Sequence, residues 1–213
     1  MPVRSTFDQQ NQLLELFQQH GGWLKAREVQ DANMPSMALT RLLEQGLIER
    51  AQRGVYRLTD TSSLPETNSE AEELLELQLR FPYARPFLVS ALHLHGLTTT
   101  RPSALQLAIP AHRHGLRVQS PAIEVFYLTK KQYNTELTSL EVRGRKLTTY
   151  TPEKTICDLL RYANKFGREL YLEGLKNYLQ KHSSHQLIRV AKTTGVWKKL
   201  SQDLEVLAHD QDH

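Results

Sequence analysis

The stretch from Gly21 to Leu58, GGWLKAREVQDANMPSMALTRLLEQGLIERAQRGVYRL, constrains the fold more than any other part of the chain. Pro35 suits the first position of a helix because its ring fixes φ, and Gly46 permits the left-handed conformation that ends one. The apolar spacing around these residues changes from helical to strand-like. With the segment before it, the pattern predicts helices over 7–20, 26–32 and 35–46 and strands over 47–51 and 55–58.

Helix, turn, helix and a two-stranded wing, in that order, are typical of a module that reads DNA. In its third helix, Leu39, Leu42 and Leu43 recur at the spacing i, i+3, i+4, so we expect them to face the other two helices. The opposite face enters the major groove, where Arg41 is the best candidate for reading a base edge. The side chains that we expect on this outer face are Ser36, Met37, Thr40, Arg41 and Glu44.

The predicted wing carries arginines on both sides of a tight turn at residues 52–54. We expect Arg50, Arg53 and Arg57 to line this wing beside the phosphates of DNA. A helix-turn-helix look-alike can also serve as a protein-docking unit, with Ser36 merely solvating an exposed helix. DNA reading is the interpretation that we favour.

Four segments along the chain carry a family resemblance. They are LLELFQQHGGWLKAREV near the start, the wing LLEQGLIERAQRGVYRL, SALHLHGLTTTRPSALQLAIP from Ser90 to Pro110, and YTPEKTICDLL from Tyr150 to Leu160. Together they resemble the AbiEi-type antitoxins of bacterial abortive-infection (type IV) toxin-antitoxin systems, a family of winged-helix transcriptional regulators. The wing alone is moderately specific, and its pairing with the later segments is much more so.

The resemblance implies a repressor that binds inverted repeats at the promoter of its own operon, with two copies on each double-stranded operator. It also implies that the protein counteracts a nucleotidyltransferase-type toxin encoded beside it, directly or indirectly. In this family, antitoxin action is usually attributed to the C-terminal domain. A stand-alone winged-helix transcription factor without a toxin is the alternative.

The length and composition indicate two domains. At 213 residues the chain exceeds a typical single domain of roughly 100–150 residues, and 39% apolar residues can build real cores. A polar, turn-forming segment at 61–69 separates two patterned regions. We therefore expect an α+β protein with an N-terminal winged helix-turn-helix at 1–60, a linker at 61–69 and a C-terminal mixed α+β domain at 70–213.

The elements of the second domain are predicted from its own periodicities. A helix over 70–81 has leucines spaced among glutamates. A hairpin over 141–150 turns at Arg143-Gly144-Arg145, after which Thr151 and Pro152 can cap the next helix. The other predicted elements are a helix over 86–96, strands over 104–110 and 123–128, and helices over 153–162, 168–181, 184–193 and 196–208.

Charge is unevenly distributed along the sequence. Residues 1–60 hold seven Lys or Arg and seven Asp or Glu, and residues 61–79 add five Glu and no base. Residues 80–213 hold the other 20 basic and 11 acidic side chains, a net charge of +9 with neutral histidines. Phosphate neutralisation supplies much of the affinity for nucleic acid, so this half either adds backbone contacts or carries dispersed, solvated charge. The candidates for phosphate contacts are Lys130, Lys131, Arg143, Arg145 and Lys146.

Neither a disulfide framework nor a membrane span is predicted. Cys157 is the single cysteine, and its helical run TICDLLRYA favours a buried core residue over a reactive thiol. The N-terminal segment lacks an apolar signal core, and no run approaches the roughly 18 apolar residues of a membrane span. We therefore expect a cytoplasmic protein.

Two histidine pairs invite a metal interpretation that their surroundings disfavour. On a helix, His93 and His95 would point about 200° apart and could not share one ion. His112 and His114 could do so in an extended segment, but no nearby cysteine or carboxylate completes a four-ligand set. We expect neither a metal site nor a cofactor.

Catalytic motifs are missing from the sequence. A nuclease needs clustered carboxylates to hold magnesium, yet no Asp/Glu-x-Lys pair occurs, and neither a glycine-rich phosphate loop nor a Gly-x-Ser-x-Gly elbow is found. Glu124, Glu141 and Asp158 are the least implausible acids, and Asp158 stands at i, i+3 from Arg161, as in a simple helix pair. We expect no enzymatic activity, and a nuclease-related DNA-binding protein ranks below both an antitoxin and a stand-alone transcription factor.

Overall fold

The computed structural model describes residues 6–210 and is a mixed α+β protein with two compact units. The first unit contains the described residues up to Tyr83 together with Leu140–Leu147. The second contains Ala84–Ser139 and the described residues from Thr148 onward. The predicted α+β class is confirmed. The division differs from the predicted one, because residues 61–83 and the tip of a later hairpin pack with the N-terminal segment.

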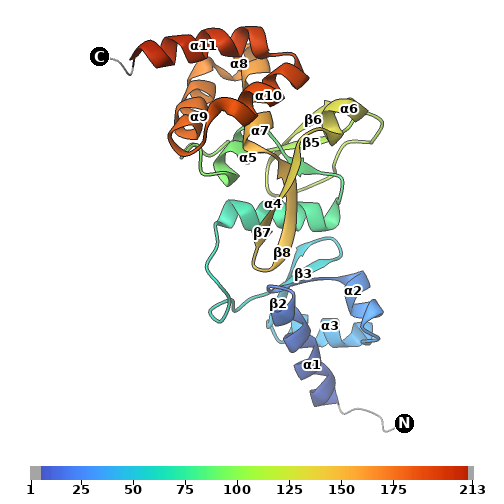
Figure 1. Cartoon of the computed structure of the whole chain (residues 1–213). Helices are drawn as coiled ribbons and strands as arrows, with labels where there is room; N and C mark the ends of the chain where they lie inside the picture. Colours follow the sequence, from blue (N-terminus) through green and yellow to red (C-terminus); the bar gives the residue numbers. More distant parts are fainter. Residues whose placement is uncertain (1–5, 211–213) are drawn as a thin grey trace. The chain divides into compact units, whose positions relative to one another are not determined.

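The first unit follows the predicted order of helices and wing strands and adds one strand to it (Figure 1). The added strand pairs antiparallel with the second wing strand, giving a sheet of order β1-β3-β2. It escaped prediction because a three-residue strand is too short to show an alternating pattern. The elements are α1 (Thr6–Gln19), β1 (Trp23–Lys25), α2 (Ala26–Asp31), α3 (Ser36–Glu44), β2 (Ile48–Gln52), β3 (Val55–Leu58) and α4 (Ser69–Arg80).

The helical spacing of the leucines explains the core of this unit. Leu39 and Leu42 of α3 are buried, as predicted, and Leu43 is partly buried against the same cluster. Leu13 and Phe17 of α1 belong to that cluster and are fully buried. One face of α3 is therefore buried in the core, and its other face is exposed to solvent.

The segment expected to be a linker is instead part of the first unit. Leu64 packs against the core of the unit. Asn68 then caps α4, because its side chain accepts a hydrogen bond of 2.8 Å from the backbone N–H of Glu70. The polar composition of 61–69 thus reflects turns and a helix cap.

Helix α4 packs against the β1-β3-β2 sheet and forms hydrogen bonds with side chains of its strands. The buried carboxylate of Glu76 accepts hydrogen bonds from Nε1 of Trp23 and from Nη1 of Arg57, both at 3.0 Å. Arg80 donates to the side-chain oxygen of Gln52 at 2.9 Å. A buried carboxylate is costly unless such donors surround it, so these partners explain how an acidic helix can pack here.

The predicted hairpin consists of β7 (Leu137–Val142) and β8 (Arg145–Tyr150). Its turn has positive φ at Arg143 (46°) and Gly144 (78°), the signature of the type I′ turns that suit two-residue hairpins. The tip of this hairpin is the part that belongs to the first unit. A Cβ on Gly21 would lie 1.9 Å from the carbonyl oxygen of Arg143, so only glycine fits at position 21.

The second unit combines a small sheet with a group of packed helices (Figure 1). The sheet order is β4-β5-β6, with β4 antiparallel and β6 parallel to β5. The predicted strands and helices are all present, and a two-residue strand, β4, and two short helices, α6 and α8, are added. The elements are β4 (Arg85–Pro86), α5 (Leu88–Leu94), β5 (Leu105–Pro110), β6 (Ile123–Leu128), α6 (Lys130–Asn134), α7 (Pro152–Arg161), α8 (Ala163–Phe166), α9 (Arg168–Lys181), α10 (Ser184–Thr194) and α11 (Trp197–Asp210).

Helix α7 lies at the centre of this unit's core. Its N-cap is Thr151, whose hydroxyl accepts a hydrogen bond from the backbone N–H of Lys154, and Pro152 occupies the first turn, as predicted. Cys157 is fully buried in the core, which confirms that prediction, and burial raises the pKa of its thiol to about 12. Within residues 6–210, no helix is long and apolar enough to cross a membrane.

Candidate nucleic-acid interface

The outer face of α3 is exposed along its whole length. Ser36, Met37, Thr40 and Glu44 are all exposed, and Met37 keeps 59% of its surface in water although it is apolar. Arg41, one turn after Met37, is half-buried on the same side. This face combines hydroxyl, guanidinium and apolar groups, which are the groups that recognise base edges and thymine methyls in a major groove.

The β2–β3 hairpin, which was predicted to be a wing, presents two arginines to solvent. Arg53 is exposed at the turn between β2 and β3. Arg50 is also exposed, and its guanidinium lies 5.6 Å from the ring centroid of Tyr56 and 3.4 Å from its hydroxyl oxygen. Tyr56 is itself buried in the core, so it holds the guanidinium of Arg50 close to the β2–β3 hairpin. Both arginines are therefore exposed on this hairpin.

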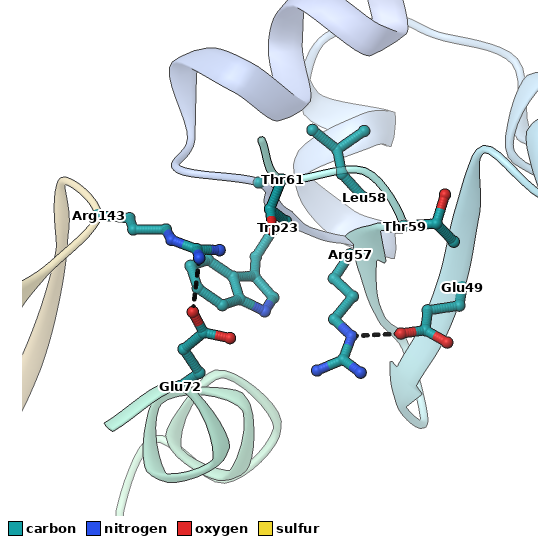
Figure 2. A pocket seen from close by; sticks show the side chains of 9 residues that line it. Trp23, Glu49, Arg57, Leu58, Thr59, Thr61, Glu72 and Arg143 are labelled. Atoms are coloured by element: carbon teal, nitrogen blue, oxygen red, sulfur yellow. Dashed lines mark hydrogen bonds and ion pairs between the residues drawn. The ribbon is translucent and has the colours of Figure 1, made fainter. Parts of the chain in front are cut away.

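Arg57, the third predicted wing arginine, has acidic partners. Its Nε lies 2.5 Å from Glu49 and its Nη1 lies 3.0 Å from Glu76. Burial alone would lower the pKa of Arg57, but the hydrogen bonds and charges of these two carboxylates raise it. Figure 2 shows Arg57 directed toward Glu49 on the neighbouring strand. Its charge is therefore neutralised within the protein.

Arg143 is also paired with a carboxylate of the first unit. Its guanidinium donates to Glu72 of α4 at 2.8 Å and to the carbonyl oxygen of Pro65 at 2.9 Å. It lies beside Trp23, 5.4 Å from the centroid of that ring (Figure 2). Only 9% of its side chain is exposed. The charge of Arg143, which was predicted to contact phosphate, is therefore matched within the first unit.

Arg145 has still more partners. Its guanidinium binds both carboxylate oxygens of Glu28 at 2.8 Å and donates to the carbonyl oxygens of His20 and Trp23 at 3.1 and 2.6 Å. Its side chain is 11% exposed. Burial would raise the pKa of Glu28, but the bonds from Arg145 and from the backbone N–H of Lys25 lower it to about 2. Arg145 therefore holds together α2, His20 and the start of β1, and its charge is matched by Glu28.

A small polar cavity lies among these ion pairs. It encloses about 200 Å³, and its lining side chains are drawn in Figure 2. The cations Arg57 and Arg143 in its wall are matched by the acids Glu49 and Glu72. With its charges balanced, the cavity offers no net attraction to an anion, so it is not part of the candidate interface.

The remaining predicted cations are exposed, but the structure divides them between the units. Lys146 belongs to the hairpin tip of the first unit, whereas Lys130 and Lys131 belong to α6 of the second unit. Arg27 on α2, which the sequence analysis did not single out, is a further exposed cation of the first unit, 3.8 Å from Asp31. A surface cation on a short helix carries no sequence signal that separates it from ordinary solvated charge.

The two units differ in net charge when the hairpin tip and α4 are counted with the first unit. The sequence of the first unit contains 11 Lys or Arg and 13 Asp or Glu, which gives −2. The second contains 16 and 10, which gives +6. The exposed face of α3 and the wing therefore have few cations for phosphate contacts, and specific base contacts must carry a larger share of any affinity.

Three further residues, His95, Glu124 and Asp158, have structural partners. The ring nitrogen Nε2 of His95 lies 2.8 Å from the carbonyl oxygen of Tyr150. Glu124 accepts a hydrogen bond from Lys165 at 2.7 Å, and Asp158 pairs with Arg161 at 2.8 Å, as predicted. No group of three or more His, Cys, Asp or Glu side chains within residues 6–210 is placed to hold a metal ion.

Comparison with known proteins supports a regulator. No curated protein matches the chain. A family model described as transcriptional regulator, AbiEi antitoxin, matches residues 11–59, which include α1 from residue 11 onward, α2, α3 and the strands β1, β2 and β3. Over this segment, the chain is similar to the AbiEi antitoxin family of transcriptional regulators.

Proposed function

We propose that the first unit is a winged helix-turn-helix that reads DNA with α3 in the major groove. The observation that carries this proposal is the outer face of α3, where Ser36, Met37 and Thr40 are exposed beside the half-buried Arg41. The opposite face is fixed in the core by Leu39 and Leu42, so the helix cannot rotate its polar side away. The match to a regulator family over the same residues supports this reading.

The wing supplies the phosphate contacts in this proposal. Arg50 and Arg53 are exposed on β2 and its turn, whereas Arg57 is neutralised by carboxylates. Exposed arginines at a wing tip suit backbone phosphates, which position a protein without reading sequence. Lys130 and Lys131 add sequence-independent affinity, because the first unit has a net charge of −2 and the second +6.

The biological role that we propose is autoregulation by an antitoxin. The protein represses its own operon by binding inverted repeats, with two copies on each operator, and counteracts a nucleotidyltransferase-type toxin. The antitoxin family supports this role. We propose that binding alone is sufficient and that the protein turns over no substrate.

A gel-shift titration tests the DNA-binding part. The full chain is titrated against the DNA upstream of its own gene at two salt concentrations, with scrambled DNA as competitor. We expect specific binding that weakens steeply with salt. The full chain is needed because the hairpin tip that completes the first unit comes from residues 140–147. Equal binding to operator and scrambled DNA would refute sequence-specific regulation.

A co-expression assay tests the antitoxin part. The adjacent reading frame, if it encodes a nucleotidyltransferase-fold protein, is expressed with and without this chain, and growth is measured. We expect growth arrest that this chain relieves. If growth arrest persists when the chain is present, the antitoxin role is refuted, and a transcription factor without antitoxin action becomes the better interpretation.

A further inference from the structure

The second unit contains a cationic cavity, and the proposed function uses only its exposed residue Lys131. It encloses about 160 Å³ between α6, α7 and α10. Lys131, Lys154 and Arg161 contribute to its wall, and none of the described residues that line it is acidic. Such a cavity is an anion site if the positive charge around it is not already matched.

Two of these cations share one buried carboxylate. Lys154 forms an ion pair with Oδ2 of Asp158, and Nη1 of Arg161 donates to Oδ1 of the same residue at 2.8 Å. The side chains of Lys154 and Asp158 are each 1% exposed. Two positive groups against one negative group leave a net charge of +1 at the inner wall. Arg161 is fixed further by a hydrogen bond of 2.6 Å to the carbonyl oxygen of Thr194.

The outer wall adds a second unmatched charge. Lys131 is exposed and has no ion pair within the described part of the chain. Glu136, which follows α6, is bound by Arg189 through hydrogen bonds of 2.7 and 3.0 Å, so its charge is already matched. The cavity and the groups bound to its wall therefore carry an excess of two positive charges.

The residues that line the cavity favour an anion whose oxygens accept hydrogen bonds from several cationic side chains at once. The hydroxyls of Thr135 and Thr193 donate to the carbonyl oxygens of Lys131 and Arg189, at 2.6 and 3.0 Å. The ammonium and guanidinium groups, which hold several N–H donors each, are then the main donors toward a ligand. Charge-assisted hydrogen bonds of this kind are among the strongest that a protein makes with phosphate oxygens.

We propose that this cavity binds the terminal phosphate of a small ligand, either inorganic phosphate or a phosphate monoester. A terminal phosphate carries roughly −1.5 to −2 at neutral pH, which matches the excess of two positive charges. Pockets that enclose a whole organic ligand measure roughly 300–1,000 Å³. At about 160 Å³ this cavity holds a phosphate group, and any sugar or base attached to it remains outside.

Isothermal titration of the full chain with inorganic phosphate, against chloride at equal ionic strength, tests the proposal. Lys131→Gln removes a wall cation without leaving a partner unpaired, and Lys176→Gln removes an exposed cation of α9 that is not part of the wall. We expect saturable binding that Lys131→Gln weakens about tenfold and Lys176→Gln leaves unchanged. No saturable binding, or equal loss in both variants, would overturn the proposal. Lys154→Met is avoided because it would leave the buried Asp158 unpaired.

Three further titrants distinguish the source of the phosphate. Tighter binding of a nucleoside 5′-monophosphate than of inorganic phosphate, with no binding of the free nucleoside, would assign the cavity to a monoester. Equal or weaker binding of the monophosphate would assign it to inorganic phosphate. If phosphate does not bind and Lys131→Gln weakens only the binding of an unphosphorylated DNA duplex, the cavity belongs to DNA contacts and the proposal fails.

Discussion

The guanidinium of Arg145 and the carboxylate of Glu28 form a two-point ion pair, with both N···O distances at 2.8 Å and a sequence separation of 117 positions. Both residues belong to the first unit, although Arg145 comes from a hairpin far along the chain. The module that carries α3 is therefore completed by a distant segment. Its stability depends on contacts that the first 60 residues do not contain.

Replacing Arg145 tests this dependence directly. Arg145→Ala would leave the Glu28 carboxylate and two backbone carbonyls without their donor, and we expect a loss of about 2–4 kcal/mol in unfolding free energy. Urea unfolding is followed by fluorescence in a Trp197→Phe background, where Trp23 is the only tryptophan. Lys146→Ala, at the exposed neighbouring position, is the control. Equal stability of the two variants would contradict the structural role of Arg145.

The same ion pair predicts a pH dependence of stability. The pKa of Glu28 is about 2 in the folded protein against an ordinary 4.5, so its contribution is full above pH 4.5 and disappears as the pH falls toward 2. We expect Glu28→Gln to lower the unfolding free energy by on the order of 2 kcal/mol at neutral pH, since part of the carboxylate is in water. The difference from the parent should shrink in urea titrations below pH 4.5. Glu15→Gln, exposed on α1, should show no such trend.

Gly21 offers a steric test of the hairpin contact. A Cβ at this position would lie 1.9 Å from the carbonyl oxygen of Arg143, so we expect Gly21→Ala to cost about 3 kcal/mol or more. Gly54→Ala is a matched control, because Gly54 also has positive φ but faces open space. We expect it to cost only the backbone strain, roughly 1–2 kcal/mol. Thermal melts that rank the two variants equally would argue against the close approach.

The proposed interface predicts two different binding defects. Arg41→Ala should cost about 1–3 kcal/mol of operator affinity and relax base preference at one position, because it reads a base edge. Arg53→Ala should weaken binding on every sequence and lower the salt slope by about one, because it contacts phosphate. Gel shifts at several salt concentrations measure both. Lys176→Ala, an exposed cation on α9, serves as the control.

Lys130 and Lys131 of the second unit are predicted to contribute to DNA affinity without reading sequence. Lys130→Ala combined with Lys131→Ala should lower affinity for operator and scrambled DNA alike and flatten the salt dependence. The reason is that both lysines are exposed and lie in the unit with net charge +6. The same gel shifts check this, and an operator-specific loss would be inconsistent with phosphate contacts.

Sequence periodicity was enough to predict the elements that local interactions define. The spacing of Leu39, Leu42 and Leu43 predicted both the existence of α3 and the face that it buries. Thr151 and Pro152 predicted the start of α7, and the apolar run around Cys157 predicted that the thiol is buried. Each of these signals lies within a few residues of the structure that it specifies.

The roles of the arginines could not be predicted in this way. Arg143, Arg145 and Arg57 stood in a wing or a hairpin turn, where exposed cations are common, and the sequence gives no sign of their acidic partners. Glu28, Glu72 and Glu76 approach them only after the chain has folded. An ion pair between distant positions depends on the path of the backbone, which no local pattern encodes.

By itself, therefore, the sequence determined the α+β class, most of the helices and strands, the face that α3 turns to its core and the burial of Cys157. The tertiary structure alone decided that α4 and a hairpin tip complete the first unit, and which cations remain exposed. It also decided that Lys131, Lys154 and Arg161 surround one cavity. Local structure follows from backbone geometry and side-chain spacing over a few residues, whereas charge pairing depends on distances that only folding establishes.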